Sequence, residues 1–221
     1  MSADIHARPA ASRAAGIVLI VVAVATAALL INHPAASGTS FTDVLRNEAA
    51  AQAMNAVVHG GFIVVLAAEL ACMAIASTRL GWQRPAVAVA FVFALVGAGF
   101  LMLSMLVDGL VTPALAARYV DTPEKAEQAR SVFVLLGTLV RFLMPLGLLF
   151  QLASVAAWSS ALVRSGGVVR AAAIVGLVVA ALAAVGIAAT AAMGPRALVA
   201  ALIGIAIWYA LIGAGLALRR I

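Results

Sequence analysis

Six long apolar segments dominate this sequence and decide what it can fold into. They cover about residues 14–31, 50–77, 86–111, 131–160, 168–191 and 197–218. Each is close to or above the roughly 20 apolar residues that a helix needs to cross a membrane. Lipid offers the backbone no hydrogen-bond partner, so helices are the expected spanning form. We therefore predict an all-α, polytopic integral membrane protein, with six transmembrane helices in one bundle and a single domain over residues 1–221.

The composition excludes the other broad classes of protein. Of the 221 residues, 66% are hydrophobic and only 10% are charged, against about 25% charged in an ordinary soluble domain. So few charges cannot cover the surface of a soluble enzyme. The single cysteine, Cys72, cannot form a disulfide within the chain. The net charge of +6 comes without a cluster of basic residues, so the expected partner is the lipid bilayer and not a nucleic acid.

Two connections carry the signals of short helices. Residues 40–54 begin with Ser40 and have Asp43 three positions later, a capping pattern that opens a helix. Residues 113–130 contain Thr122 followed by Pro123, which suits the first turn of a helix. We predict short amphipathic helices in the first and third connections.

The basic residues predict an orientation. Both termini and the even-numbered connections hold more of them than the odd-numbered connections do. The first group is Arg8, Arg13, Arg79, Arg84, Arg164, Arg170, Arg219 and Arg220; the second is Arg46, Arg118, Lys125, Arg130 and Arg196. Because basic residues concentrate on the cytoplasmic side, both termini are expected in the cytoplasm. The short connections and abundant alanine suggest a bacterial inner membrane. The first apolar run is longer than that of a cleaved signal peptide, so it is expected to remain as a span.

The second predicted span carries an unusual polar face. Gln52, Asn55, His59 and Glu69 fall, with Glu48 just outside, within an arc of about 100° on a helical wheel. Polar groups at membrane depth are costly and normally face the bundle interior or water. We expect this face to point inward. Glu69 without a nearby cation would exchange a proton readily, although pairing with Arg79 is an alternative.

Three further polar residues stand in the third and fourth spans. Asp108 lies near the outer end of the third, where Gly109 and Pro113 are expected to end the helix. Arg141 and Gln151 lie in the fourth. At 1.5 Å per residue, His59 and Arg141 are about 13 and 15 Å from the outer surface and Asp108 about 5 Å. This predicts an outer-half cluster of His59, Asp108 and Arg141 near Asn55, with Glu69 and Gln151 in a deeper layer.

Several roles remain open for this cluster. Arg141 would either hold an anionic ligand or form a buried ion pair with Asp108. His59 would relay protons, bind haem or be a hydrogen-bonded core histidine. No metal ligands are predicted, because the sequence has no i, i+4 ligand pair and no Cys/His cluster. Haem is disfavoured because His6 and His33 lie outside the spans. No known catalytic motif is present, so no catalytic residue is predicted.

The leading functional hypothesis is binding or transport of a small solute through a polar cavity in the periplasmic half. Its ligand-binding or proton-coupling residues would be His59, Asp108, Arg141, Glu69, Asn55 and Gln151. One alternative is a membrane-embedded enzyme or a haem or redox subunit using the same cluster. The other is a structural or assembly partner without a ligand. A small-molecule ligand and a homo-oligomer are the expected partners besides lipid; the cofactor and any enzymatic activity remain open.

Overall fold

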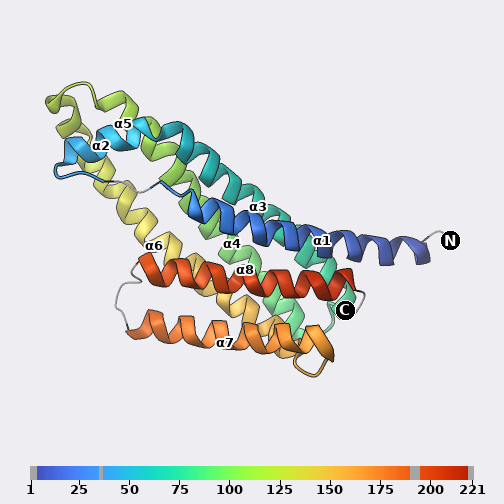
Figure 1. Ribbon diagram of the computed structural model, residues 1–221. Coiled ribbons are helices and arrows are strands. Elements are labelled where there is room, and N and C mark those ends of the chain that lie inside the picture. Colours follow the sequence, from blue (N-terminus) through green and yellow to red (C-terminus); the bar gives the residue numbers. More distant parts are fainter. Residues whose placement is uncertain (1–3, 35–36, 190–194, 219–221) are drawn as a thin grey trace.

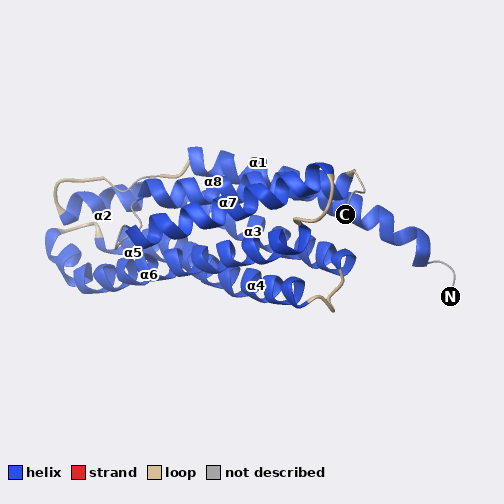
Figure 2. Cartoon of the chain, turned by 90° about the horizontal axis from the view of Figure 1, so that it is seen from below, coloured by secondary structure: helices blue, strands red, loops and turns tan. Residues whose placement is uncertain are grey.

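The computed structural model describes residues 4–34, 37–189 and 195–218. Within these ranges the chain forms helices and no strand, which confirms the all-α prediction. The helical elements, in chain order, are α1 (Asp4–Ile31), α2 (Phe41–Ala50), α3 (Gln52–Leu80), α4 (Pro85–Leu106), the π-helix η1 (Val107–Val111), α5 (Thr112–Tyr119), α6 (Pro123–Leu162), α7 (Gly167–Ala189) and α8 (Pro195–Ala217). Figures 1 and 2 show the long helices running side by side.

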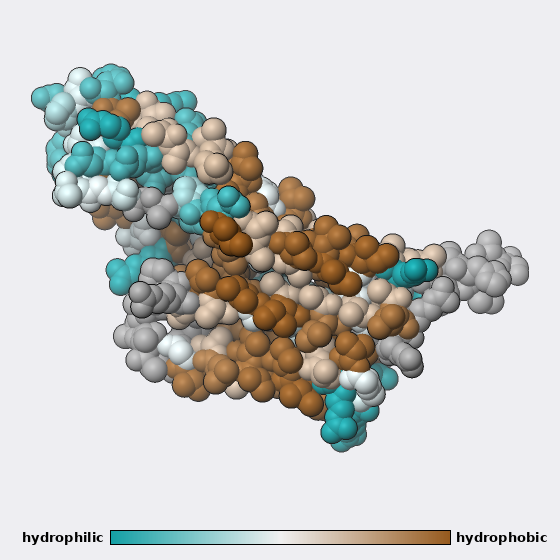
Figure 3. Space-filling model, in the orientation of Figure 1, coloured by the Kyte–Doolittle hydropathy of each residue, from teal (hydrophilic) through white to brown (hydrophobic). Residues whose placement is uncertain are grey.

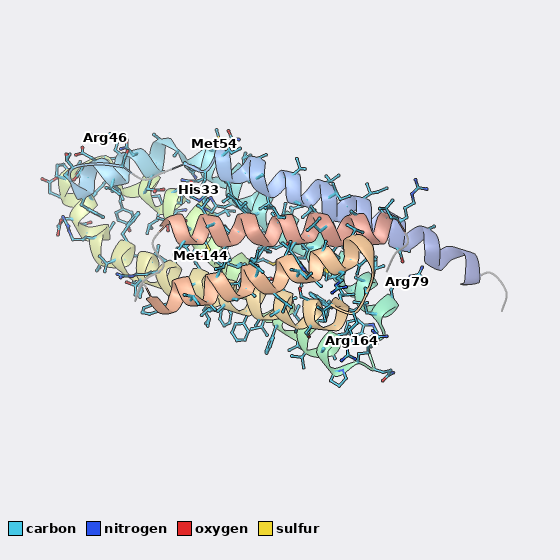
Figure 4. All side chains as sticks on the ribbon, turned by 60° about the horizontal axis from the view of Figure 1, so that its bottom comes forward. His33, Arg46, Met54, Arg79, Met144 and Arg164 are labelled. Carbon is cyan, nitrogen blue, oxygen red and sulfur yellow. The ribbon has the colours of Figure 1, made fainter. Side chains whose placement is uncertain are left out.

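Six helical stretches in the described residues are long and apolar enough to cross a membrane. They are residues 10–31, 52–80, 85–119, 123–162, 167–186 and 197–217. Each corresponds to one predicted segment, so the six-helix prediction is confirmed. Residues 190–191 of the predicted fifth segment lie outside the described residues, as do Arg219 and Arg220. Arg79 and Arg164 lie at the opposite end of the bundle from Arg46 (Figure 4), as six successive crossings require.

The predicted end of the third span is wrong. The helix does not stop at Gly109 but continues through η1 and α5 to Tyr119. Pro113 does not interrupt it, because Pro113 stands in the first turn of α5, where an N–H is not required. Likewise, α6 runs without a break through Pro145.

Glycines allow the closest helix contacts. A Cβ atom added to Gly97 of α4 would lie 2.9 Å from the backbone nitrogen of Gln151 and 2.9 Å from the carbonyl oxygen of Gly147, both in α6. Gly16 of α1 and Gly213 of α8 face each other with equally little space. These are the contacts that small residues permit between membrane helices.

A polar lobe extends beyond the bundle. It consists of α2, α5 and the first turns of α6 (Figure 1), and it carries the largest hydrophilic area in Figure 3. Leu45, Ala116 and Ala126 form its small buried core. The predicted capping box is present: the Ser40 hydroxyl accepts from the Asp43 amide, and the Asp43 carboxylate accepts from the Ser40 amide, both at 3.2 Å. The short helix of the first connection is thereby confirmed. The third connection also holds a short helix, α5, and Thr122 and Pro123 open the long helix α6.

Candidate functional site

The polar face of α3 points into the bundle. Asn55, His59 and Glu69 are buried, with His59 only 1% exposed. Gln52, at the start of the helix, is exposed and lies apart from this group. The i, i+4 spacing places His59 directly above Asn55 on this face.

Two groups lie next to the nitrogen atoms of the His59 ring. Its Nδ1 atom lies 3.0 Å from the carbonyl oxygen of Asn55. A carbonyl can only accept, so Nδ1 carries the hydrogen and Nε2 of the neutral ring presents a lone pair. This Nε2 lies 3.3 Å from Oδ2 of Asp108, and it has no hydrogen-bond partner in the described part of the chain. With a neutral ring, two groups that accept hydrogen bonds therefore face each other, whereas a protonated ring would form an ion pair with the carboxylate.

The π-helix η1 brings Asp108 to this position. Its wider turn is visible in the Thr112 hydroxyl, which donates to the carbonyl of Val107 five residues earlier at 2.8 Å. Gly109 presses directly on the His59 ring, and a Cβ atom there would overlap Cβ and Cγ of His59. Single π-turns inside α-helices often occur at functional sites.

His33 joins this pair from the connection after α1. Its ring packs edge-on against that of His59, with 4.8 Å between the ring centroids. His33, His59 and Asp108 each offer one ligand atom, and these atoms all lie within 4.8 Å of one another. Partial desolvation lowers the pKa of His33, and the positive charge of a protonated His59 ring lowers it further. We call these three residues the His–His–Asp cluster.

Sequence reasoning missed His33. It lies two residues past the end of α1 and belongs to no ligand spacing. The usable signal was that His33 follows the first span, whereas Asp108 lies near the end of the third predicted span on the same side of the membrane. That signal would have placed a second histidine near Asp108.

A second carboxyl group lies beside the cluster. Asn55 Nδ2 donates to Glu48 Oε2 at 3.1 Å, which ties α2 to α3. Burial raises the pKa of Glu48, and the nearby Asp108 carboxylate raises it further. The site thus gathers two acidic groups, Glu48 and Asp108, at the end of the bundle that carries the polar lobe.

A cavity of about 390 Å³ opens below the cluster, between α1, α3, α4, α6 and α8. Most of its lining is apolar, including Phe62, Met105 and Met144. His33 and Met144, which both line it, are labelled in Figure 4. The polar members of the lining are Thr26, His33, Glu69, Asp108, Arg141 and Gln151. The lining is therefore more apolar than the polar cavity that the sequence suggested.

Arg141 and Gln151 also line this cavity, and the ion pair that was one of the two roles considered for Arg141 is not formed. Arg141 and Asp108 both line it, but they form no ion pair within 4.0 Å in the described residues. Arg141 is exposed and does not belong to the buried His59 pair. Gln151 donates to the carbonyl of Ala94 at 3.2 Å and leaves its own carbonyl oxygen without a partner in the described chain.

Glu69 lies deeper, on the cavity wall. It is 6% exposed, and the described residues place no cation within 4.0 Å of it. Arg79, which the sequence offered as its partner, instead donates to the Ser12 hydroxyl at 2.6 Å. The two polar levels are therefore the His–His–Asp cluster, at the end of the bundle that carries the polar lobe, and Glu69 with Gln151 deeper in the bundle.

Comparison with protein-family models, with curated proteins and with solved structures finds no match for this chain.

Proposed function

We propose that this membrane-spanning helical protein binds a small, largely apolar molecule in its internal cavity. The observation that carries this proposal is the composition of the cavity wall, which is apolar along most of its surface and polar at two separate levels. Its volume of about 390 Å³ falls within the roughly 300–1,000 Å³ of ligand pockets. Apolar lining with a few placed polar groups is the usual construction of such pockets.

The polar groups suggest how the molecule is oriented. Arg141 stands near the outer level, where its guanidinium could donate to an anionic or carbonyl group of the ligand. At the inner level, the unpartnered Gln151 oxygen and the Glu69 carboxyl offer hydrogen bonds to a second polar group. An amphipathic molecule with an apolar body and a polar end fits both levels.

Proton-coupled transport of this molecule is the extension that the site supports best. Glu69 faces the cavity, is almost fully buried and has no cation partner in the described chain. A carboxyl group in such a place can change its protonation state when a ligand enters. We propose that Glu69 couples a proton to ligand binding.

The proposed setting is a bacterial inner membrane with both termini in the cytoplasm. Large apolar side chains, including Val21, Val64, Phe142 and Leu182, are more than half exposed on the outside of the bundle. Lipid chains would cover them. A C-terminal reporter active only in the periplasm should stay silent, and activity of that reporter would reverse the orientation.

Photo-crosslinking in lipid nanodiscs tests the binding proposal. A fatty acid carrying a diazirine would be activated by light, and the modified residues would be mapped by peptide mass spectrometry. We expect modification of cavity residues such as Phe62 and Met144. Modification restricted to lipid-facing residues such as Phe142 would contradict the proposal and favour a purely structural role.

A pair of variants in α8 provides the control. Ala206 lines the cavity and is 8% exposed, whereas the adjacent Ile207 is 50% exposed and is not part of the lining. Ala206→Phe should fill the cavity and abolish modification there. Ile207→Phe adds a ring of the same kind to the outer surface and should leave cavity modification unchanged.

A further inference from the structure

The His–His–Asp cluster gathers ligand atoms from three separate parts of the chain. His33 follows α1, His59 stands in α3 and Asp108 stands in η1. Their ligand atoms lie within 4.8 Å of one another. Two imidazoles and one carboxylate form a ligand set that zinc and non-haem iron accept.

The orientation of His59 is that of a metal ligand. Its Nδ1–H is held by the Asn55 carbonyl at 3.0 Å, so the Nε2 lone pair is directed away from this anchor. Metal-binding histidines commonly fix their other nitrogen in this way, through a carbonyl or a carboxylate. The anchor selects the tautomer that can donate its electron pair to a cation.

The separation between His59 and Asp108 fits two ligands of one ion better than a direct hydrogen bond. A bond from an imidazolium to a carboxylate is about 2.7–2.9 Å long, whereas Nε2 and Oδ2 are 3.3 Å apart. With metal–ligand distances of about 2.0–2.2 Å, two neighbouring ligands of a tetrahedral ion lie about 3.3–3.5 Å apart. The observed distance equals the short end of that range.

The charge around the cluster also favours a cation. Two carboxyl groups, Asp108 and Glu48, lie in this region, and Glu48 accepts a hydrogen bond from the side chain of Asn55, whose backbone carbonyl anchors His59. In the described residues no Arg or Lys forms an ion pair with either carboxylate. A divalent ion at Asp108 would supply the positive charge that, among the described residues, only a protonated His59 ring otherwise offers within 4.0 Å of it.

We propose that His33, His59 and Asp108 bind a divalent transition-metal ion such as zinc. A turn of the exposed His33 side chain brings its ring nitrogen to the ion, because His33 stands in a connection and not in a packed helix. His33 and Asp108 both line the cavity, so the proposed site adjoins it. Three protein ligands with one open position are the arrangement of catalytic zinc sites, where water or a polar group of a bound molecule completes the shell. This site rests on its own ligand geometry and does not depend on what the cavity binds.

Metal titration of the purified protein tests the site. The full chain, purified in detergent through a tag without histidines and treated with a chelator, would be titrated with Zn²⁺ by calorimetry and with Co²⁺ by visible absorption. We expect one ion per chain and the intense visible bands of four-coordinate Co²⁺. Absence of binding for both ions would overturn the proposal.

Substitutions of the ligands locate the ion. His33→Ala and Asp108→Asn should each weaken binding by about tenfold or more. His6→Ala, which removes the remaining histidine of the sequence, should bind as the unaltered protein does. The exposed His33 lies outside the helices, so its variant should fold even if a change at Asp108 lowers the yield. Unchanged affinity in a folded His33→Ala protein would overturn the assignment.

The cavity variants separate this proposal from the previous one. Ala206→Phe should lose modification by the fatty acid and keep Zn²⁺ binding, because Ala206 offers no metal ligand. His33→Ala should lose Zn²⁺ and keep the cavity. Loss of one property therefore does not imply loss of the other.

Discussion

Replacement of Gly109 by alanine should destabilise the protein, although the same change elsewhere in the helix should be harmless. The added Cβ atom of Gly109→Ala would overlap Cβ and Cγ of His59. These atoms belong to the stem of a ring held between Asn55 and Asp108, so they cannot move aside as the end of a flexible side chain would. Either η1 or the His59 ring must shift.

The magnitude follows from the kind of overlap. Adding an atom to a well-packed interior usually costs about 1–3 kcal/mol. The clash involves rigid stem atoms, so we expect the upper part of this range, roughly 2–3 kcal/mol. Gly99 provides the matched control, because it lies in the preceding helix α4 and a Cβ atom there meets nothing within 4 Å. Gly99→Ala should stay within about 1 kcal/mol of the unaltered protein, since alanine is the better helix former.

Equilibrium unfolding in mixed micelles measures this difference. The free energies of unfolding of Gly109→Ala, Gly99→Ala and the unaltered protein would be compared under one set of conditions. Gly109→Ala should also weaken Zn²⁺ binding, because the shift separates Asp108 from His59. Equal stability of the two variants would refute the close packing of η1 on the His59 ring.

Three further outcomes follow from single contacts. The buried Trp208 Nε1–H donates to the Ser159 hydroxyl at 3.1 Å. Ser159→Ala removes this acceptor and should lower the free energy of unfolding by about 1–3 kcal/mol in the same assay. Ser160→Ala changes an exposed hydroxyl and should lower it by no more than about 0.5 kcal/mol. Ser40→Ala breaks the capping box of α2 and should destabilise that helix by about 1 kcal/mol. The change should be measurable as faster hydrogen exchange of the α2 amides, and unchanged exchange would contradict a role for the cap. Hydrogen bonds from the Ser40 hydroxyl and, to a smaller extent, from Thr39 lower the pKa of Asp43 from 3.8. The ionised carboxylate therefore stabilises the cap fully above about pH 4, and this stabilisation is lost as the pH falls through the lowered pKa of the folded state. After correction for the intrinsic pH dependence of exchange, the amides of α2 should therefore be least protected at the lowest pH. Protection that does not change with pH would contradict a role of the Asp43 carboxylate in the cap.

The six helices followed from the sequence because length and apolarity alone decide membrane spanning. The starts of α2 and α6 followed from Ser40 and Pro123, whose local hydrogen-bonding and φ preferences act over a few residues. The burial of Asn55, His59 and Glu69 followed from helical periodicity. These are local properties, and local properties can be deduced from neighbouring residues.

The composition of the site could not be deduced in the same way. Propensity gives no signal for the π-turn at η1, and Gly109 was interpreted as a helix end although its role is close contact with His59. His33 reaches the site through the path of a connection, which depends on how α1 packs against its neighbours. An ion pair with Asp108 was one of the two roles considered for Arg141, and it is not formed in the described residues, because the position of a residue along a helix does not fix the direction of a long side chain. The identity of the cluster is a tertiary property.

Native mass spectrometry of the protein released from its own membrane tests the central claim most directly. If the cavity binds a small apolar molecule, the unaltered protein and Ile207→Phe should retain a bound species of the same mass after mild removal of detergent. Ala206→Phe, with its cavity filled, should appear only as the bare chain. A bare chain in every sample, or a bound species that survives in Ala206→Phe, would contradict the account.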